Sequence, residues 1–168
     1  NEIVRHHTSG QLKVAPEHSE PSILGLMGKP PVRTLTQFRD QFENLSRQAG
    51  KEQYLTYYLI AAYPGCSDRE MRNLHKFVSE KLHIQPEQVQ IFTPTPSTYA
   101  SLMYYTEKDP FTGRKIFVEK NLHGKSRQKE LVTLEHMRNP SPSRPGFIHG
   151  KSANHKSPVQ GKKSDHGK

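Results

Sequence analysis

The sequence contains a single cysteine, Cys66, which excludes an intramolecular disulfide and a metal site built from several cysteines. No apolar run approaches the ~20 residues that a membrane-spanning helix needs, and no secretory signal precedes the first predicted strand. Together these absences predict a protein of a reducing, cytoplasmic compartment without a membrane partner. The sequence begins at Asn1 without an initiator methionine, inside a predicted helix, so we expect a fragment of a longer protein.

Hydrophobic residues are also scarce, at 32% of the 168 residues, and the formal net charge is +9. The charge is unevenly distributed. Residues 1–111 hold twelve basic and twelve acidic residues, whereas residues 112–168 hold thirteen basic and four acidic ones. This division predicts a neutral folded part followed by a basic tail. We expect residues 1–118 to form the folded domain and residues 119–168 to be a basic, largely disordered tail.

Familiar catalytic motifs are missing as well. The stretch Gly25–Pro30 contains the glycines and lysine of a phosphate-binding loop, but its spacing is wrong, and proline replaces the Ser or Thr that holds the metal. The pair His6–His7 is typical of solvated residues at a helix end, with a metal site as the alternative. Cys66 precedes a helix start, a place that lowers the pKa of a thiol. No base is evident beside it, so we interpret it as structural, with a nucleophile as the alternative.

The best-defined element is the apolar run Tyr54–Ala62, which only Thr56 interrupts. It is too short to span a membrane and too continuous for a half-exposed strand, so it predicts a strand buried on both faces. Pro64–Gly65 ends the strand, and Ser67 with Glu70 forms a capping box that starts a helix. Ligands of α/β folds bind in the loop after such a strand. A connection without a ligand is the alternative.

The remaining elements alternate between strand and helix. Strands are predicted at 12–15 and 89–92, with a further one at 116–118, and helices at 21–27, 34–49, 67–82, 99–105 and 126–138. This alternation predicts an α/β fold with a parallel sheet and right-handed crossovers. Three strands are too few to close a barrel. Glu17 follows the first strand, where a carboxylate either accepts hydrogen bonds from a ribose or amine or caps a helix.

Five segments closely resemble the YgiQ family of radical S-adenosylmethionine (SAM) proteins, in unbroken order over residues 1–118. They are Ser9–His18, Leu26–Pro30, Ala61–Cys66, Val89–Pro96 and Met103–Thr106. The resemblance implies the C-terminal half of a partial (βα)6 TIM-type barrel, with about three parallel βα units. It also implies a missing N-terminal half of the same barrel as the partner of this chain.

The same resemblance implies two cofactors. The family holds a [4Fe–4S] cluster through a Cys-x3-Cys-x2-Cys loop, and the cluster reduces S-adenosylmethionine to a radical that abstracts hydrogen from a substrate. That loop is absent from this sequence. We therefore expect both cofactors to act in the full-length protein, and the chain alone to be inactive. The substrate is not implied by the family.

The resemblance also assigns site residues to the ends of the three strands. It implies that Glu17 faces the cofactor or substrate and that Phe92 and Thr93 lie beside the adenine. The residues implied to pass close to the adenosine are Ala61, Ala62, Tyr63, Pro64 and Gly65. Gly65 has independent physical support, because glycine lets a ligand approach the backbone closely. Tyr63 and Ile91 depart from the family, which commonly has His and Asp there. No catalytic residue is assigned.

The basic tail supports a different function. Residues 112–168 carry the whole net charge with only two aromatic residues, Phe117 and Phe147. This composition suits nonspecific contact with RNA or DNA phosphates. The alternative to an enzyme fragment is therefore a non-catalytic nucleic-acid-binding module that acts through its tail, and a merely solubilising extension is a third interpretation. The enzyme fragment and the nucleic-acid-binding module are compatible interpretations if the enzyme modifies a nucleic acid.

Overall fold

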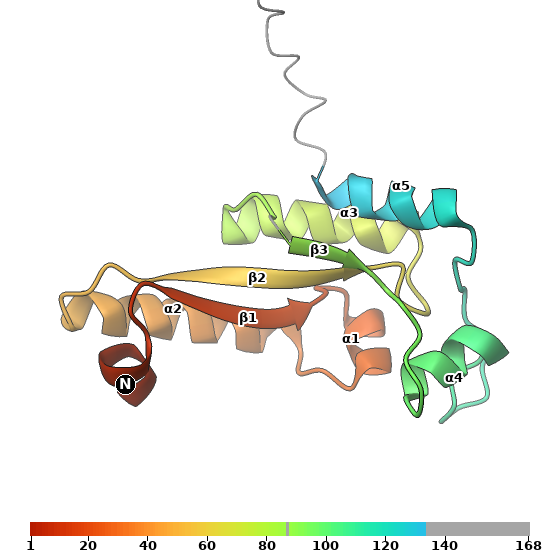
Figure 1. Ribbon diagram of the computed structural model, residues 1–168, viewed down its shortest axis with the longest axis horizontal. Helices are drawn as coiled ribbons and strands as arrows, with labels where there is room; N and C mark the ends of the chain where they lie inside the picture. The colour runs from red at the N-terminus through yellow and green to blue at the C-terminus, as the bar shows by residue number, and fades with distance from the viewer. Residues whose placement is uncertain (87, 134–168) are drawn as a thin grey trace, which may run out of the picture.

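A computed structural model describes residues 1–86 and 88–133, and its centre is a sheet of three parallel strands (Figure 1). The strands β1 (Gln11–Glu17), β2 (Tyr54–Ala61) and β3 (Gln88–Ile91) are hydrogen-bonded in the order β1-β2-β3. Because all three run in the same direction, their C-terminal ends meet at one edge of the sheet. The predicted α/β class with a parallel sheet is confirmed, and the arrangement is consistent with a partial TIM-like unit.

Helices connect the strands. The π-helical η1 (Ile3–His7) precedes β1, and α1 (Pro21–Met27) and α2 (Val32–Gln48) lie between β1 and β2. Helix α3 (Asp68–Phe77) continues as the π-helical η2 (Val78–Leu82) before β3, and α4 (Tyr99–Thr106) and α5 (Leu122–Thr133) follow β3. Figure 1 shows α2 and α3 behind the strands, with α1 and α4 beside the end to which the arrows point.

Short-range sequence signals explain several helix boundaries. The predicted capping box is present: the Ser67 side chain accepts a hydrogen bond from Arg69 N, and Glu70 Oε2 accepts one from Ser67 N at 2.9 Å. Gly28 ends α1 in the left-handed conformation, with φ of 67°. Helix α2 starts two residues before Thr34, because Pro31 sets the extended backbone that precedes its first turn.

Strand β2 is covered on one face by the described residues. Tyr57, Leu59 and Ala61 are buried in the same core as Met71, Leu74 and Val78 of the α3–η2 segment. The alternate residues Thr56, Tyr58 and Ile60 are only half-buried. The prediction of a strand buried on both faces is therefore wrong for this part of the protein. The continuous apolar run thus gives β2 a second face that is only half-buried among the described residues.

The folded part extends beyond residue 118. Gln128 and Val132 of α5 are buried, and Arg127 Nε lies 2.9 Å from Asp68 Oδ2 at the start of α3. The structure thus differs from the expected division, which assigned residues 119–168 to the tail. A few apolar and amide side chains suffice to anchor this otherwise basic helix. Residues 134–168, with the remainder of the predicted helix and the predicted disorder, lie outside the described residues.

Two further expectations concern single elements. Residues 116–118 do not form a strand, and instead Lys108 and Lys115 make an isolated antiparallel bridge that closes the loop after α4. Within residues 1–86 and 88–133, no helix combines the length and apolar character needed to cross a bilayer. The predicted compartment stays a prediction.

Candidate functional site

The predicted site residues lie along the edge where the three strands end. Glu17 ends β1, the turn Ala62–Cys66 follows β2, and Phe92–Thr93 follows β3. Phe92 N donates a hydrogen bond to Ala61 O at 2.8 Å, and the rings of Tyr63 and Phe92 pack edge to face with centroids 5.3 Å apart. We call these residues the strand-end edge. The contacts join its β2 and β3 portions directly.

Glu17 is tied to the loop that follows α1. Its Oε1 lies 3.0 Å from Lys29 Nζ, which also donates a hydrogen bond to Ala15 O at 2.9 Å. The backbone of Glu17 is left-handed, with φ of 66°, after an irregularity in the β1–β2 pairing. The N-cap of α1 is Glu20, so Glu17 does not cap that helix. Its half-buried carboxylate remains within reach of a ligand.

The turn after β2 is mostly covered by other parts of the chain. Ala61 and Ala62 are fully buried, and Tyr63 and Pro64 are buried as well. Gly65 is half-buried and its N–H donates to Phe117 O at 2.7 Å. A ligand at this edge would therefore meet Gly65, Phe92, Thr93 and Glu17 rather than the four residues before Gly65.

Contacts within the chain explain why position 65 is a glycine. Its φ is 94°, and a Cβ placed on it would lie 2.5 Å from Leu26 Cδ1 of α1. The missing side chain thus makes room for Leu26, and the backbone conformation itself favours glycine. Leu26 fills the side of Gly65 where a side chain would lie, so a ligand at the edge could contact Gly65 only through its remaining exposed backbone.

Tyr63 replaces the histidine that the resembled family commonly has. Burial, with a smaller contribution from the Glu17 carboxylate, raises the pKa of Tyr63 to about 12. Because of this raised pKa, the phenol is protonated at neutral pH. Its hydroxyl donates to Leu26 O at 3.4 Å. Tyr63 therefore packs the edge, and its side chain does not serve as a base at that pH.

Cys66 lies beside an imidazole that the sequence did not place there. His18 Nδ1 accepts a hydrogen bond from Glu20 N at 3.1 Å, which puts the ring proton on Nε2, 3.5 Å from Cys66 Sγ. Burial lowers the pKa of His18 to about 4, against the opposing charge of Glu70. The neutral ring thus donates towards sulfur and is not a base for the thiol.

The thiol itself stays protonated. Burial raises the pKa of Cys66, and the Glu70 carboxylate adds to the effect, which outweighs the influence of the nearby helix start. Cys66 Sγ donates to Ser67 O at 3.7 Å. These contacts support the structural interpretation of Cys66 over the nucleophilic one.

We expect Cys66 to react with iodoacetamide at least about a hundredfold more slowly in the folded chain than in concentrated urea, because a buried thiol reacts only through local opening. Mass spectrometry over time measures the rate of alkylation. Equal rates in the two conditions would contradict the burial of Cys66 and its contact with His18.

An aromatic cluster lies beside the end of β3. Phe92 contacts Tyr63 on one side and Tyr104 of α4 on the other, with centroids 5.9 Å apart in the second pair. Lys125 Nζ lies 4.7 Å from the centroid of the Tyr104 ring and donates to its hydroxyl at 3.0 Å. Phe92 is half-buried, so its ring offers a surface on which a flat base could stack.

The described residues do not fit an iron–sulfur cluster. Within residues 1–86 and 88–133, no group of three or more His, Cys, Asp or Glu side chains is placed to hold a metal ion. Cys66 is fully buried, and the His6–His7 pair lies at the exposed end of η1. The described part of this chain therefore offers no set of ligands for a cluster. The accessible groups of the strand-end edge, by contrast, are of kinds that suit a nucleoside.

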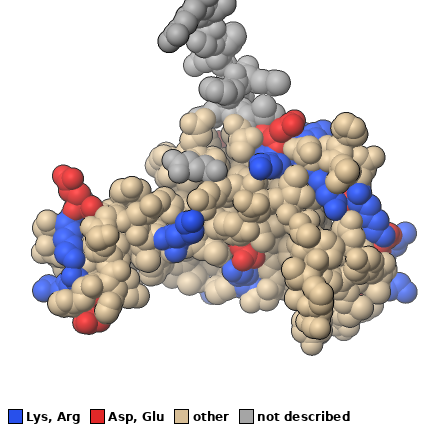
Figure 2. Space-filling model, viewed as in Figure 1, with Lys and Arg blue, Asp and Glu red and all other residues tan. Residues whose placement is uncertain are grey.

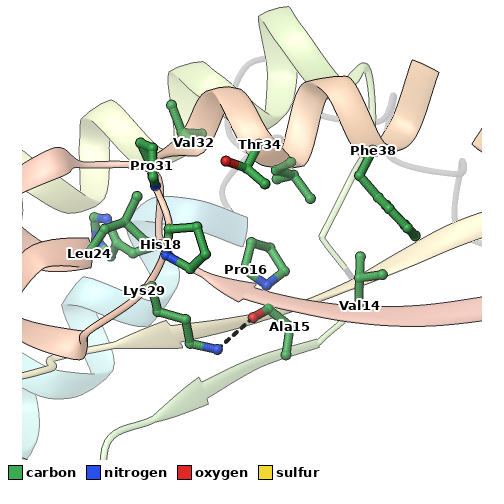
Figure 3. Close-up of a pocket in the computed structure, with 12 residues that line it drawn as sticks. Val14, Ala15, Pro16, His18, Leu24, Lys29, Pro31, Val32, Thr34 and Phe38 are labelled. Carbon is green, nitrogen blue, oxygen red and sulfur yellow. Dashed lines mark hydrogen bonds between the residues drawn. The ribbon is translucent and has the colours of Figure 1, made fainter. Parts of the chain in front are cut away.

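A separate apolar pocket of about 340 Å³ lies between β1 and the start of α2 (Figure 3). Figure 3 shows Pro16, Thr34 and Phe38 around it, with Lys29 at its side. The ammonium of Lys29 is engaged by Ala15 O and Glu17. This pocket is a second place for a small ligand, on the helix side of β1.

The face of the molecule shown in Figure 2 gives little support to a broad basic interface. On the face shown in Figure 2, Lys and Arg side chains are separated by uncharged surface, with several near the right-hand end where α5 lies in Figure 1. Lys125 and Arg127 of α5 engage Tyr104 and Asp68 of the same chain. The predicted nucleic-acid contact through the basic tail, residues 119–168, depends largely on residues outside the described ranges and stays a prediction.

Two residues of the site were missed by sequence reasoning. His18 follows β1, and Cys66 follows β2. Because β1 and β2 pair in parallel, the residues after them lie close together, and this pairing is a usable signal for the contact. Gln128 contacts Ala62 and Cys66 from α5. A single glutamine in a basic helix carries no local signal for such a role.

The fold and the strand-end edge define an α/β unit of parallel strands with a candidate ligand site at their C-terminal ends. The family described as a domain of unknown function (DUF3362) matches residues 87–141, from the start of β3 through α5. Homologues of the chain are UPF0313 proteins, and UPF0313 is the YgiQ-like family.

Three UPF0313 proteins illustrate the similarity. The chain is 58% identical to one from Fusobacterium nucleatum over 132 residues, which is 79% of this chain and 23% of that protein. It is 46% identical to one from Thermotoga maritima, over 80% of this chain and 24% of that protein. It is 40% identical to one from Clostridium perfringens, over 82% of this chain and 21% of that protein. The chain thus spans less than a quarter of these relatives.

Proposed function

We propose that the chain is the C-terminal half of a partial (βα)6 barrel in a radical SAM enzyme, and that its strand-end edge forms part of the wall around the nucleoside of SAM. The observation that carries this proposal is the meeting of Glu17, Gly65 and Phe92–Thr93 at the C-terminal edge of a parallel sheet. Ligands of parallel α/β folds bind at that edge. The link to this class of enzyme comes from the resemblance of five segments to the YgiQ family of radical SAM proteins, and the UPF0313 homologues support the family level of that resemblance.

Two further observations support a larger barrel. The second face of β2 is only half-buried among the described residues, as Tyr58 and Ile60 show. The relatives are more than four times as long as the matched segment, so they contain ample chain to cover this face. The N-terminal half of the barrel is the partner that we assign to it.

Each accessible residue then has a distinct role. The half-buried ring of Phe92 offers stacking to the adenine. The next residue, Thr93, is exposed, and its hydroxyl donates to Ile91 O at 3.5 Å. The Glu17 carboxylate, held by Lys29, accepts hydrogen bonds from a ribose or amine. When reduced by a cluster bound elsewhere in the complete protein, SAM would supply the radical that abstracts hydrogen from the substrate. The buried turn residues Ala62–Pro64 support the edge from behind.

The test compares this chain with a complete protein that includes upstream sequence. We expect the chain alone to form no stable [4Fe–4S] absorbance under anaerobic reconstitution, because it lacks the thiolates. The complete protein should form the cluster through a Cys-x3-Cys-x2-Cys loop and release 5′-deoxyadenosine when reduced with SAM. Absence of that loop from the upstream coding sequence would contradict the proposal, as would a cluster formed on Cys66.

A further inference from the structure

The side chain of Gln128 joins α5 to both ends of the turn after β2. Gln128 is fully buried. Its Oε1 accepts a hydrogen bond from Ala62 N at 3.1 Å, and its Nε2 donates one to Cys66 O at 3.2 Å. Ala62 and Cys66 are the first and last residues of the turn. One amide side chain therefore spans the whole turn and satisfies a backbone group at each end.

The backbone of the turn depends on this support. Ala62 adopts a φ of 58°, in the left-handed region that a residue with a Cβ seldom occupies. It is also fully buried, so its N–H has no access to water and needs a partner within the protein. Gln128 Oε1 is that partner. Without it, the strained conformation would bury an unsatisfied donor.

Helix α5 is anchored to α3 independently of Gln128. Arg127 Nε lies 2.9 Å from Asp68 Oδ2, and His75 Nδ1 donates to Val132 O at 3.1 Å. The helix is therefore a fixed support from which Gln128 reaches the turn. Helix α5 also lies inside the match to the domain of unknown function, whereas the turn lies before it.

We propose that Gln128 is a positioning residue through which α5 sets the conformation of the turn Ala62–Cys66. The role of Gln128 in the turn stands on the contacts above, whereas its effect on the wall around SAM rests on the proposed function. Gln128 does not touch the cofactor. It acts through the turn, and its loss should loosen the turn while the sheet and α3 stay folded.

Cys66 provides a reporter inside the turn, because its thiol is buried and is the only one in the chain. In the full chain, we expect Gln128→Ala to raise the rate of Cys66 alkylation at least about tenfold, since two buried hydrogen bonds are lost. Lys129→Ala, on the exposed side of the same helix, should leave the rate unchanged. Far-UV circular dichroism checks that both variants stay folded. An unchanged rate in a folded Gln128→Ala variant would overturn the proposal.

Gln128→Glu provides a second test that does not depend on a cavity. A protonated carboxyl has one donor and one acceptor, as the amide of Gln128 uses here, whereas an ionised carboxylate has no donor. We expect the alkylation rate, divided by that of the wild type at each pH, to stay near one in acid and to rise as the carboxyl ionises. A ratio independent of pH would contradict the two-bond role of Gln128.

The link to the cofactor needs a separate measurement. In the complete, reconstituted protein, Gln128→Ala should weaken SAM binding about tenfold, with unchanged iron content and unchanged binding in Lys129→Ala. Faster alkylation together with unchanged SAM affinity would refute the placement of the turn at the cofactor wall, and so the proposed function. Unchanged alkylation would refute the role of Gln128 itself.

Discussion

Gly65→Val is expected to reduce the free energy of unfolding of the chain by about 3 kcal/mol, from the strained backbone and the crowding of a packed core. The φ of Gly65 is 94°, a conformation that a β-branched residue strongly disfavours. A Cβ there would also lie 2.5 Å from Leu26 Cδ1. Urea unfolding followed by circular dichroism measures the loss.

Two variants separate the causes of this loss. Gly65→Val in a Leu26→Ala background should recover the part due to crowding and keep the part due to φ. Gly25→Ala is the matched control, because Gly25 lies inside α1 with no atom within 4 Å of an added Cβ, and it should stabilise the chain slightly. Equal effects of the changes at Gly65 and Gly25 would contradict the described turn.

Acid is expected to destabilise the chain by about 2 kcal/mol between about pH 7 and about pH 5 through His18. Burial holds the pKa of His18 in the folded state at about 4, below the unfolded value of 6.5. The unfolded chain therefore binds the extra proton first, so the contribution of His18 is complete above pH 6.5 and falls as the pH drops towards 4.

A variant isolates this contribution. In His18→Gln, the loss of stability over this range should shrink, because the amide can keep a donor and an acceptor but does not titrate. Glu70 contributes at lower pH. Burial opposes its ionisation, but hydrogen bonds from Ser67 and Arg69 outweigh burial and lower the pKa of Glu70 to about 2. An identical dependence of urea midpoints on pH in the wild type and His18→Gln would contradict a buried, neutral His18.

Local signals in the sequence predicted the parts of the fold that depend on neighbouring residues. The apolar run of β2, the capping box of Ser67 and Glu70 and the stop at Gly28 all appear as predicted. Each depends on residues within a few positions of one another. The order of these elements was then enough to predict parallel strands whose C-terminal ends meet.

The parts that could not be predicted depend on contacts between distant segments. Gln128 reaches Ala62 across 66 positions, and His18 reaches Cys66 across 48. Leu26 fills the space beside Gly65, which by sequence alone was equally suited to a ligand. Hydrophobic pattern and turn chemistry do not encode such pairings. The family resemblance implied cofactor contacts for Ala61–Gly65, and it could not indicate that Ala61–Pro64 are buried by other parts of this chain.

Photochemical labelling by SAM in the complete, reconstituted protein tests the strand-end edge most directly. After irradiation with radiolabelled SAM and trypsin digestion, label from this region should appear in two peptides, residues 52–69 and residues 82–108, which contain Gly65 and Phe92–Thr93. Excess unlabelled SAM should remove it. Label confined to the peptide of residues 34–39, which contains Thr34, Leu35 and Phe38 of the pocket between β1 and α2, would contradict a cofactor wall at the ends of the strands.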